Sequence, residues 1–428
     1  MGIKPRTIIA FMLLIAGLFL IVKVFSVYWI IVFFNIVLIY INCVFIFAYI
    51  EYRHKRAPVP KSWPTISVVV PNFNGEKTLA KCIDSIRQME YPSRKEIIVI
   101  DDGSSDSSKK ILSKISGIKV IAKKKNEGKA KGLNDGIKIA KGELIAAIDS
   151  DTFPEKGALM KMVARFDSPD VGAVTGLVRS YKPRGFVEKI QEIEYLISFG
   201  FFQSVLADIN GIMVTPGPMS VFRKDVLKKI GYFDVTNITE DMEIAMRLQY
   251  NHYRIASSPE SVIYTVVPNN LTHWFRQRTR WYRGKFVNTR KYASMVFNPK
   301  YGEFGMFSFP FSLVADGLAI LLIAVTVSAN LENVFNYFGF VASWAGAGGN
   351  ILGALPTGFS LHSSIYFYFF TIVLYSFLVY VSHNFVKDRL SVWKLPEIIF
   401  YMFVYGFFIS FVYFTSFFKE INSSDYTW

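Results

Sequence analysis

The chain has 428 residues, of which 52% are hydrophobic and 16% aromatic, and its formal net charge is +15. This apolar content argues against an ordinary soluble protein and predicts membrane spans, each of which needs about 20 mostly apolar residues. The excess of Lys and Arg lies within residues 51–300, where it suits an anionic ligand or an anionic membrane surface. Because no nucleic-acid-binding motif accompanies this charge, we expect no nucleic-acid partner.

The first 50 residues contain two apolar stretches, 8–27 and 29–50, separated by a very short connection. A signal peptide is the alternative for the first stretch, but no small-residue cleavage site follows it. Basic residues precede the first stretch and follow the second, which favours a hairpin with both ends in the cytoplasm. Residues 1–50 are therefore predicted to be two transmembrane helices of a multi-pass protein of the cell membrane.

From residue 66 to about residue 256, short β-branched runs alternate with helical patterns. Such alternation predicts an α/β domain with a mostly parallel sheet covered by helices on both faces. Ligands of these sheets bind beyond the carboxyl ends of the strands. We predict a cytoplasmic domain over residues 51–260, with strands at 66–70, 97–100, 118–121 and 144–148 and helices around 79–89 and 130–137.

The stretch 186–206 is amphipathic and leaves two interpretations open, a helix in the membrane interface and an ordinary core helix. Its apolar face is formed by Ile190, Ile193, Ile197 and Phe201. The next region, residues 261–300, is predicted to hold further interfacial helices that join the domain to the membrane.

Residues 301–428 are predicted to form a C-terminal transmembrane region of three or four helices. Stretches 304–329, 362–382 and 396–418 have the length and composition of spans. The Gly- and Ala-rich stretch 334–355 is ambiguous, so the whole chain has five or six spans. The basic loop 383–395 favours the cytoplasm and therefore five spans.

Acidic motifs follow two of the predicted strands. Asp101 and Asp102 begin the run DDGSSD, and carboxylates there can accept hydrogen bonds from a uracil or a ribose. Helix capping by Asp102, Ser104 or Asp106 is the alternative. Asp149 and Asp151 of the run DSD lie two residues apart, so both carboxylates can converge on a hard divalent cation. A solvated turn is the alternative there.

Two further segments carry candidate site residues, one of them basic and the other acidic. Lys125, Lys129 and Lys131 precede or open a helix, where cations are unfavourable unless an anion such as a phosphate lies nearby. A merely solvated lysine run is the alternative. The run TED ends in Glu240 and Asp241 at a helix start, and Asp241 is the predicted general base for a sugar hydroxyl. Capping of that helix is again the alternative.

The run QRTRW places Gln277, Arg280 and Trp281 on one helical face, at positions i, i+3 and i+4. The three side chains combine an amide, a guanidinium that matches phosphate and a flat apolar ring. Residues 276–291 contain no acid, so anchoring to anionic lipids is a second interpretation, and the two can hold on opposite faces.

Taken together and in this order, the four motifs resemble those of family 2 membrane glycosyltransferases, which include cellulose, hyaluronan and poly-N-acetylglucosamine synthases. The segments PNFNGE, KNEGKAKGLN and GPMS are similar to further stretches of that family, with Phe73 where the family usually has Tyr. The resemblance covers roughly residues 60–290. It implies a Rossmann-like domain of the family A glycosyltransferase type, inserted between transmembrane helices.

The resemblance also implies a UDP-sugar donor, Mg²⁺ or Mn²⁺ as cofactor, and a growing glycan or a lipid as acceptor. It assigns catalysis to Asp241 with Glu240, and the metal to Asp149 and Asp151. The acceptor set that it implies is Gly217, Pro218, Met219 and Trp281. The donor set is Pro71, Asn72, Asn74, Glu76, Asp102, Lys125, Lys129, Asp149, Gln277, Arg280 and Trp281.

The QRTRW element is associated with processive members of the family. The resemblance therefore implies an inverting enzyme that polymerises a β-linked polysaccharide and translocates it across the membrane. A non-processive enzyme that modifies a lipid acceptor is the alternative. A channel or transporter is disfavoured, because the predicted spans hold few ionisable residues, chiefly Lys23 and Asp316. The oligomeric state and the donor sugar stay open.

Overall fold

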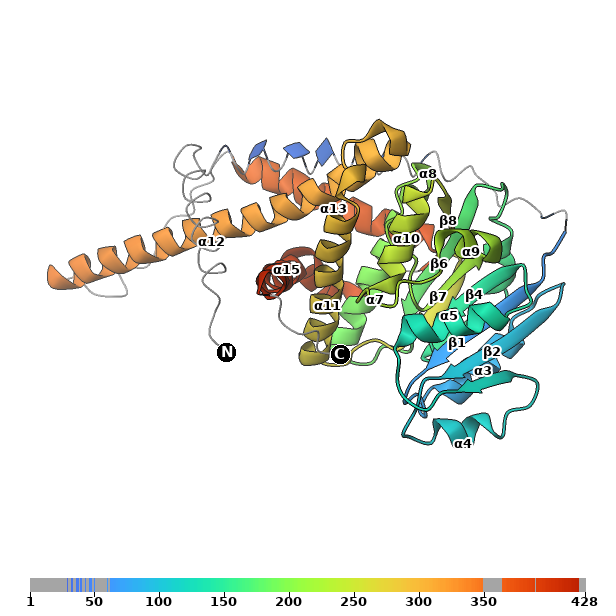
Figure 1. Cartoon of the computed structure of the whole chain (residues 1–428). Coiled ribbons are helices and arrows are strands. Elements are labelled where there is room, and N and C mark those ends of the chain that lie inside the picture. The colour runs from blue at the N-terminus through green and yellow to red at the C-terminus, as the bar shows by residue number, and fades with distance from the viewer. Residues whose placement is uncertain are drawn as a thin grey trace.

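The computed structural model describes Pro60 and residues 62–348, 364–388 and 390–422, with scattered helical positions between 29 and 50. The predicted hairpin of residues 1–50 therefore lies largely outside the described residues. Figure 1 shows the described part as an α/β domain from which long helices extend.

One eight-stranded sheet, in the order β3-β2-β1-β4-β7-β6-β8-β5, forms the centre of the α/β domain. The first four strands of this order are parallel, whereas β7 and β5 run antiparallel to their neighbours. The predicted strands and the mostly parallel sheet are confirmed. The strands are β1 Ile66–Asn72, β2 Lys95–Asp101, β3 Lys119–Ala122, β4 Leu144–Ile148, β5 Thr152–Pro154, β6 Val171–Ser180, β7 Met219–Arg223 and β8 Arg254–Thr265.

Helices cover both faces of this sheet, and the alternation of side chains along β4 shows why. Ala146 and Ile148 face the core beneath α3 and α6, while Ile145 and Ala147 face the core beneath α5, α9 and α10. Both faces are apolar, as a doubly covered sheet requires. The helices are α3 Leu79–Gln88, α4 Ser108–Leu112, α5 Lys129–Ile139, α6 Ala158–Val163, α9 Lys224–Ile230 and α10 Glu240–Tyr250.

The amphipathic stretch forms α7 Phe186–Tyr195, a π-helical turn at Leu196–Phe202 and α8 Gln203–Asp208. All four residues of its apolar face are at most 3% exposed. They pack against the C-terminal helices and the rest of the protein. Because protein covers this apolar face, its burial favours the core-helix interpretation.

The predicted boundary at residue 260 falls inside β8, which continues the sheet to Thr265. A single long helix, α11 Leu271–Lys291, then carries the QRTRW motif out of the domain. The short turns Ala293–Met295, Pro299–Tyr301 and Phe304–Ser308 lead into the C-terminal helices.

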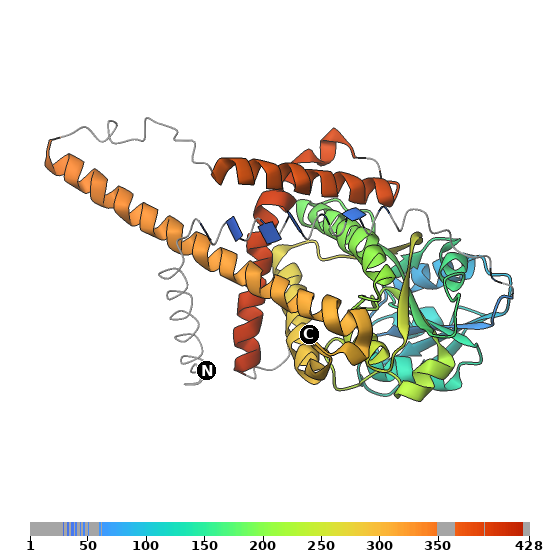
Figure 2. The same ribbon diagram turned by 90° about the horizontal axis from the view of Figure 1, so that it is seen from above.

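The C-terminal helices are α12 Phe309–Gly346, α13 Ser364–Phe385 and a nearly continuous helix formed by α14 Leu395–Phe400, a π-helical turn Tyr401–Tyr405 and α15 Gly406–Ile421. α15 lies along α11, with Phe275 and Tyr282 of α11 packed against Phe411 and Tyr413 of α15, whereas α12 extends away from the α/β domain (Figure 2). The expected break between residues 329 and 334 is absent, because α12 runs through it to Gly346. Within the described residues, one helical stretch, Val392–Ile421, is long and apolar enough to cross a membrane.

The basic loop before α14, whose Val392–Lys394 forms a short turn, docks on the α/β domain. Asp388 in this loop accepts ion pairs from Arg179 of β6 at 3.0 Å and from Lys394 at 2.7 Å. Lys189 of α7 pairs with Glu397 of α14 at 3.1 Å. The loop and the domain therefore lie on the same side of the C-terminal helices.

Candidate active site

The site begins where the loops after β1 and β2 are joined side by side by hydrogen bonds. The amide of Asn72 donates to Asp101 at 3.2 Å, and the Asn74 side chain accepts from the backbone N–H of Ser105 at 2.9 Å. Glu76 accepts from the backbone N–H of Ser107 at 3.1 Å. The parallel register of β1 and β2, which sets Asn72 opposite Asp101, brings these loops together. Pro71 lies within β1 beside them.

Asp102 is 3% exposed, and three donors surround its carboxylate. The backbone N–H groups of Glu127 and Gly128 donate to its carboxylate at 3.1 and 2.8 Å, and Lys123 pairs with it at 3.1 Å. Asp102 thus fixes the loop before α5 at the mouth of the sheet, rather than capping α4. Asp106 instead accepts a hydrogen bond from the N–H of Ser108, the first residue of α4, whose N-cap position is occupied by Ser107.

The DSD motif follows β4 and presents its carboxylates beyond the sheet. Asp149 is partly exposed, whereas Asp151 accepts a hydrogen bond from Thr265 of β8 at 3.4 Å. Burial, followed by the negative charge of Asp149, raises the pKa of Asp151 to about 6. Two carboxylates that repel each other at the end of a buried strand are an unfavourable arrangement that a cation relieves.

Lys129 at the start of α5 joins the DSD and TED motifs. Its ammonium lies 2.7 Å from Asp149 and 2.8 Å from Glu240. Burial disfavours the charge, but these carboxylates raise the pKa of Lys129 above its usual value. The anions that offset a cation at this helix start are therefore side chains of the protein. Lys125 is exposed, and its backbone lies against Gly103, the residue after Asp102.

The pKa values of the two acids of the TED motif are shifted in opposite directions. Burial acts to raise the pKa of Glu240, but Lys129 and Arg280 bring it below its usual value. For Asp241, burial and the neighbouring charge of Glu240 prevail and raise the pKa to about 6. Asp241 also accepts a hydrogen bond from its neighbour's N–H at 2.9 Å, so its carboxylate is held at the start of α10.

The GPMS loop closes over these acids without contributing charge. A Cβ atom on Gly217 would lie 2.6 Å from the Lys129 ammonium and 3.0 Å from an Asp149 oxygen, so a side chain there would displace the ammonium. Met219 begins β7, opposite Ile148. A pocket lies between the loop, α5 and α10, and its lining includes Lys129, Leu133, Ala147, Ile148, Asp149, Thr215, Pro216, Gly217, Ser220, Phe222, Phe233, Glu240 and Asp241.

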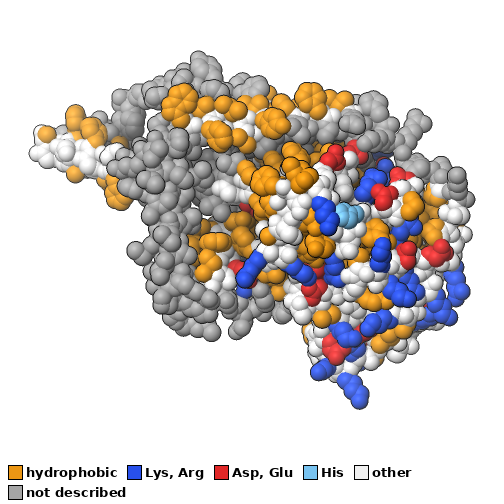
Figure 3. All heavy atoms as spheres, turned by 45° about the horizontal axis from the view of Figure 1, so that its top comes forward, with side chains coloured by type: hydrophobic (Ala, Val, Ile, Leu, Met, Phe, Trp, Pro, Cys, Tyr) orange, Lys and Arg blue, Asp and Glu red, His pale blue; other side chains and the backbone are white. Residues whose placement is uncertain are grey.

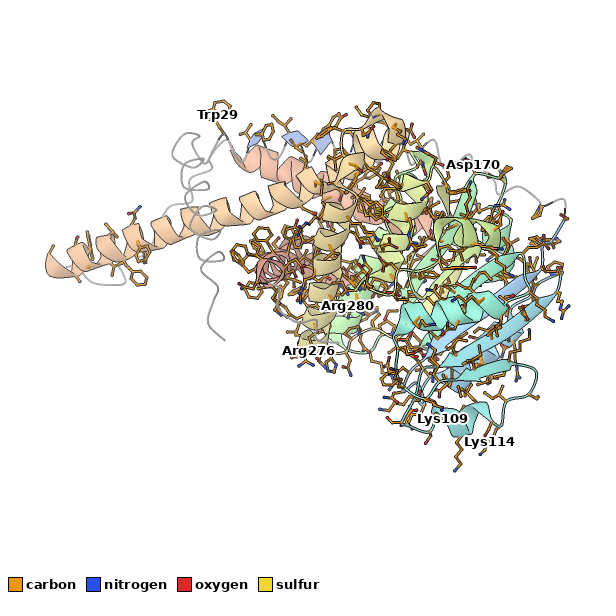
Figure 4. The ribbon with its side chains drawn as sticks, in the orientation of Figure 1. Trp29, Lys109, Lys114, Asp170, Arg276 and Arg280 are labelled. Atoms are coloured by element: carbon orange, nitrogen blue, oxygen red, sulfur yellow. The ribbon has the colours of Figure 1, made fainter. Side chains whose placement is uncertain are left out.

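The QRTRW motif reaches the same edge of the sheet from α11. Arg280 donates to the carbonyl of Ile238, just before the TED motif, at 3.2 Å. Trp281 packs with Val178 of β6 and Val267, which follows β8. Figure 4 shows Arg280 and Arg276 on the part of α11 beside the domain, whereas Lys109 and Lys114 lie at the domain's far end.

Three charged residues that this arrangement uses were not predicted from the sequence. Lys123 holds Asp102, and Arg278, within QRTRW, forms an ion pair with Glu194 of α7. A sequence signal existed for Arg278 alone, since Trp274 and Trp281 flank it at i−4 and i+3 on one helical face. Lys123 and Glu194 gain their roles from partners far along the chain, which no local pattern reveals.

Asp149 and Asp151 offer oxygen ligands of the type that Mg²⁺ and Mn²⁺ prefer. Among the described residues, no group of three or more His, Cys, Asp or Glu side chains is placed to hold a metal. The two carboxylates therefore fit a cation that takes the rest of its ligands from a substrate and water. This donor set does not fit a closed structural metal site.

The fold of the chain is that of a known class of transferases. Over 93% of its length the chain resembles the mannosyltransferase PcManGT from Pyrobaculum calidifontis, solved in complex with GDP-Man and Mn²⁺. The TM-score is 0.62, the sequence identity is 16% and all of that chain is covered. The α/β domain has the family A glycosyltransferase fold, as predicted.

The family follows from the sequence of the same domain. Residues 67–231 match the model of glycosyl transferase family 2, so the chain carries a family 2 glycosyltransferase domain. Poly-beta-1,6-N-acetyl-D-glucosamine synthases of Staphylococcus epidermidis RP62A and Staphylococcus aureus COL are 34% and 31% identical to it over 223 residues. The aligned part is 51% of this chain, and the chain spans about half the length of these relatives, 54%.

Proposed function

We propose that the chain is a processive, inverting glycosyltransferase of the cell membrane that polymerises a UDP-linked N-acetylhexosamine into a β-linked polysaccharide. The observation that carries the proposal is the Lys129 bridge, which brings the DSD and TED motifs together beside QRTRW. The likeness to poly-N-acetylglucosamine synthases favours an N-acetylhexosamine as the donor sugar and a polymer as the product.

In this reaction an acceptor hydroxyl attacks the anomeric carbon of the donor. The hydroxyl proton passes to Asp241 as the new bond forms, and the bond from the anomeric carbon to the diphosphate oxygen breaks. Nucleoside diphosphate leaves with that electron pair, and the anomeric configuration inverts. A base with a pKa of about 6 is mostly deprotonated at neutral pH and still basic enough to take a proton.

Asp149 and Asp151 would hold the divalent cation, which neutralises developing charge on the departing diphosphate as a Lewis acid. Lys129 and Arg280 add positive charge from the protein on the same side. Asn72, Asn74, Glu76 and Asp102 shape the end of the sheet where the nucleoside would lie. The GPMS loop and Trp281 would border the acceptor end of the site.

The C-terminal helices suit a membrane location for this enzyme. Several of their large apolar side chains are exposed, including Phe335 at 71% and Phe411 at 62%. Apolar surface of this extent marks contact with lipid or another protein. The docked basic loop would then lie on the cytoplasmic side with the domain. The growing glycan and membrane lipids are the partners that this arrangement favours.

The test is to incubate the full-length chain in lipid nanodiscs with a panel of radiolabelled nucleotide sugars and Mg²⁺ or Mn²⁺. We expect labelled polymer from UDP-N-acetylglucosamine, with none after chelation of the metal. Product that extracts into organic solvent as single-sugar adducts would show a lipid acceptor and refute processivity. Absence of nucleoside diphosphate release with every donor would refute the transferase assignment.

A further inference from the structure

Arg278 is the largest fully buried side chain of the described residues, at 1% exposure. It lies within QRTRW, yet the functional set predicted from the sequence passed over it. On α11 it faces the same side as Trp274 and Trp281. Burying a guanidinium is costly unless it is paired, so its position calls for a physical reason.

The contacts of Arg278 provide that reason. Its guanidinium forms an ion pair with Glu194 of α7 and donates a hydrogen bond to the side-chain oxygen of Gln277. It also lies over the ring of Trp281, 4.1 Å from the ring centroid, and 5.8 Å from the ring of Tyr195. A single planar group thus contacts both Gln277 and Trp281.

Trp281 is linked to the DSD motif through the residues that follow β8. The ring packs against the cluster of Val178, Tyr195 and Val267, and the N–H of Val266, next to Val267, donates to the carbonyl of Asp151 at 3.3 Å. A change in the orientation of the indole therefore has a short path, through Val267 and Val266, to the backbone of the DSD motif. The Arg278 guanidinium over the ring opposes rotation of the indole, because the cation–π attraction requires the face of the ring to be turned toward the cation.

We infer that Arg278 and Glu194 are a positioning pair that fixes the plane of Trp281 and the amide of Gln277, and so orients acceptor and donor. This inference rests on the proposed function for its consequence. Lysine would keep the charge and the pairing with Glu194, but it lacks the planar fork that serves Gln277 and Trp281 together. A purely structural clamp between α7 and α11 has no such requirement for a planar group.

The experiment compares Arg278→Lys with Arg283→Lys in the full chain in nanodiscs. Arg283 is a matched control, since it is 4% exposed on the same helix and pairs with Glu420 of α15 at 3.0 Å. We expect Arg278→Lys to lower kcat/KM for sugar transfer about 10- to 100-fold, the usual effect of a small misplacement. Glu194→Gln should do the same, while Arg283→Lys stays within about twofold of wild type, as expected for a residue away from the reacting groups.

A second measurement reads the orientation of Trp281 without activity. The near-ultraviolet circular dichroism difference between wild type and Trp281→Phe isolates the signal of this indole. Arg278→Lys should change that signal and Arg283→Lys should leave it intact, with melting temperatures of both variants close to each other.

Two results would overturn the inference: wild-type transfer activity in Arg278→Lys, or equal losses of activity in Arg278→Lys and Arg283→Lys. If the wild type transfers no sugar from any donor, the proposed function fails, and the dichroism comparison still decides whether Arg278 orients Trp281. If transfer fails only in Trp281→Phe and not in Arg278→Lys, the function stands and the positioning pair does not.

Discussion

The α/β domain and the C-terminal helices differ in where they place apolar and charged side chains. In the domain, apolar side chains are buried on both faces of the sheet, and charged groups converge at its carboxyl edge. In the C-terminal helices and in the loop before α14, large aromatic side chains are exposed, with Phe335 of α12 at 71% and Trp393 of the loop at 86%. Figure 3 shows hydrophobic side chains gathered over those helices, while charged ones are spread over the domain. The two regions are built for different surroundings, and the chemistry belongs to the first.

The sharpest test of this division is Asp241→Asn, which leaves the shape of the site and removes the base. We expect sugar transfer to fall about 10³-fold, within the usual range for loss of a general base. Binding of UDP and the melting temperature should be nearly unchanged. Asp225→Asn, an exposed acid in the first turn of α9, is the control and should retain full activity. Wild-type transfer by Asp241→Asn would remove Asp241 from the mechanism.

The pH dependence of transfer probes the same carboxyl without a mutation. Because the pKa of Asp241 is raised to about 6, its basic form is lost as pH falls through that value. We expect kcat/KM to drop about tenfold per pH unit below 6. The contribution of Asp241 to folding has the other sign, since a carboxyl with a raised folded pKa stabilises the fold when protonated. A kcat/KM that does not change between pH 7 and pH 5 would contradict this assignment of Asp241 as the base.

A substitution of Lys129 tests whether its ion pairs with Asp149 and Glu240 also stabilise the domain. Lys129→Met leaves Asp149 and Glu240 without their shared cation, and we expect unfolding to become easier by about 1–3 kcal/mol, a value reduced by partial exposure. Lys131→Met removes only an i,i+4 pair with Asp135 and should cost less than about 0.5 kcal/mol. Chemical denaturation followed by tyrosine and tryptophan fluorescence measures both. Equal stabilities of the two variants would show that the bridge is not structural.

The smallest effect is expected in the other region. Trp393→Ser should change the stability of the protein by less than about 0.5 kcal/mol, because the ring packs against little of the chain. In nanodiscs made with brominated lipid, however, the wild type should show quenched emission that this variant partly loses. Trp63, which packs edge-on against Tyr91 in the domain, offers the matched control through Trp63→Phe. Equal losses of quenching in Trp393→Ser and Trp63→Phe would contradict the expectation that only the C-terminal region contacts lipid.

The sequence was sufficient for the parts of the fold that repeat locally. The β-branched runs of β1, β2 and β4 are apolar throughout because both faces of the sheet are covered, and this pattern is visible without a structure. The antiparallel placement of β7 between β4 and β6 could not be predicted, because long-range pairing decides it. The uninterrupted course of α12 was not predicted, because the polar residues Asn330, Glu332 and Asn333 separate two apolar stretches of the sequence without preventing a continuous helix.

The same distinction applies to the site. Acids at strand ends and helix starts were predictable because their positions follow from local elements. The partners that tune them were not, since Lys123 reaches Asp102 across a loop and Glu194 reaches Arg278 from another helix. Lys129 was identified as a ligand for phosphate, yet the structure gives it two carboxylates of the protein.

The Lys129 bridge has a consequence for how the chain tolerates an empty site. An ammonium held between two motifs is an internal counter-ion, so the acidic edge of the sheet does not need an external metal to stay assembled. Removing divalent ions should therefore abolish the proposed sugar transfer without unfolding the protein. When a diphosphate arrives, the same ammonium can exchange one anionic neighbour for another, and the two motifs become free to turn toward the sugar.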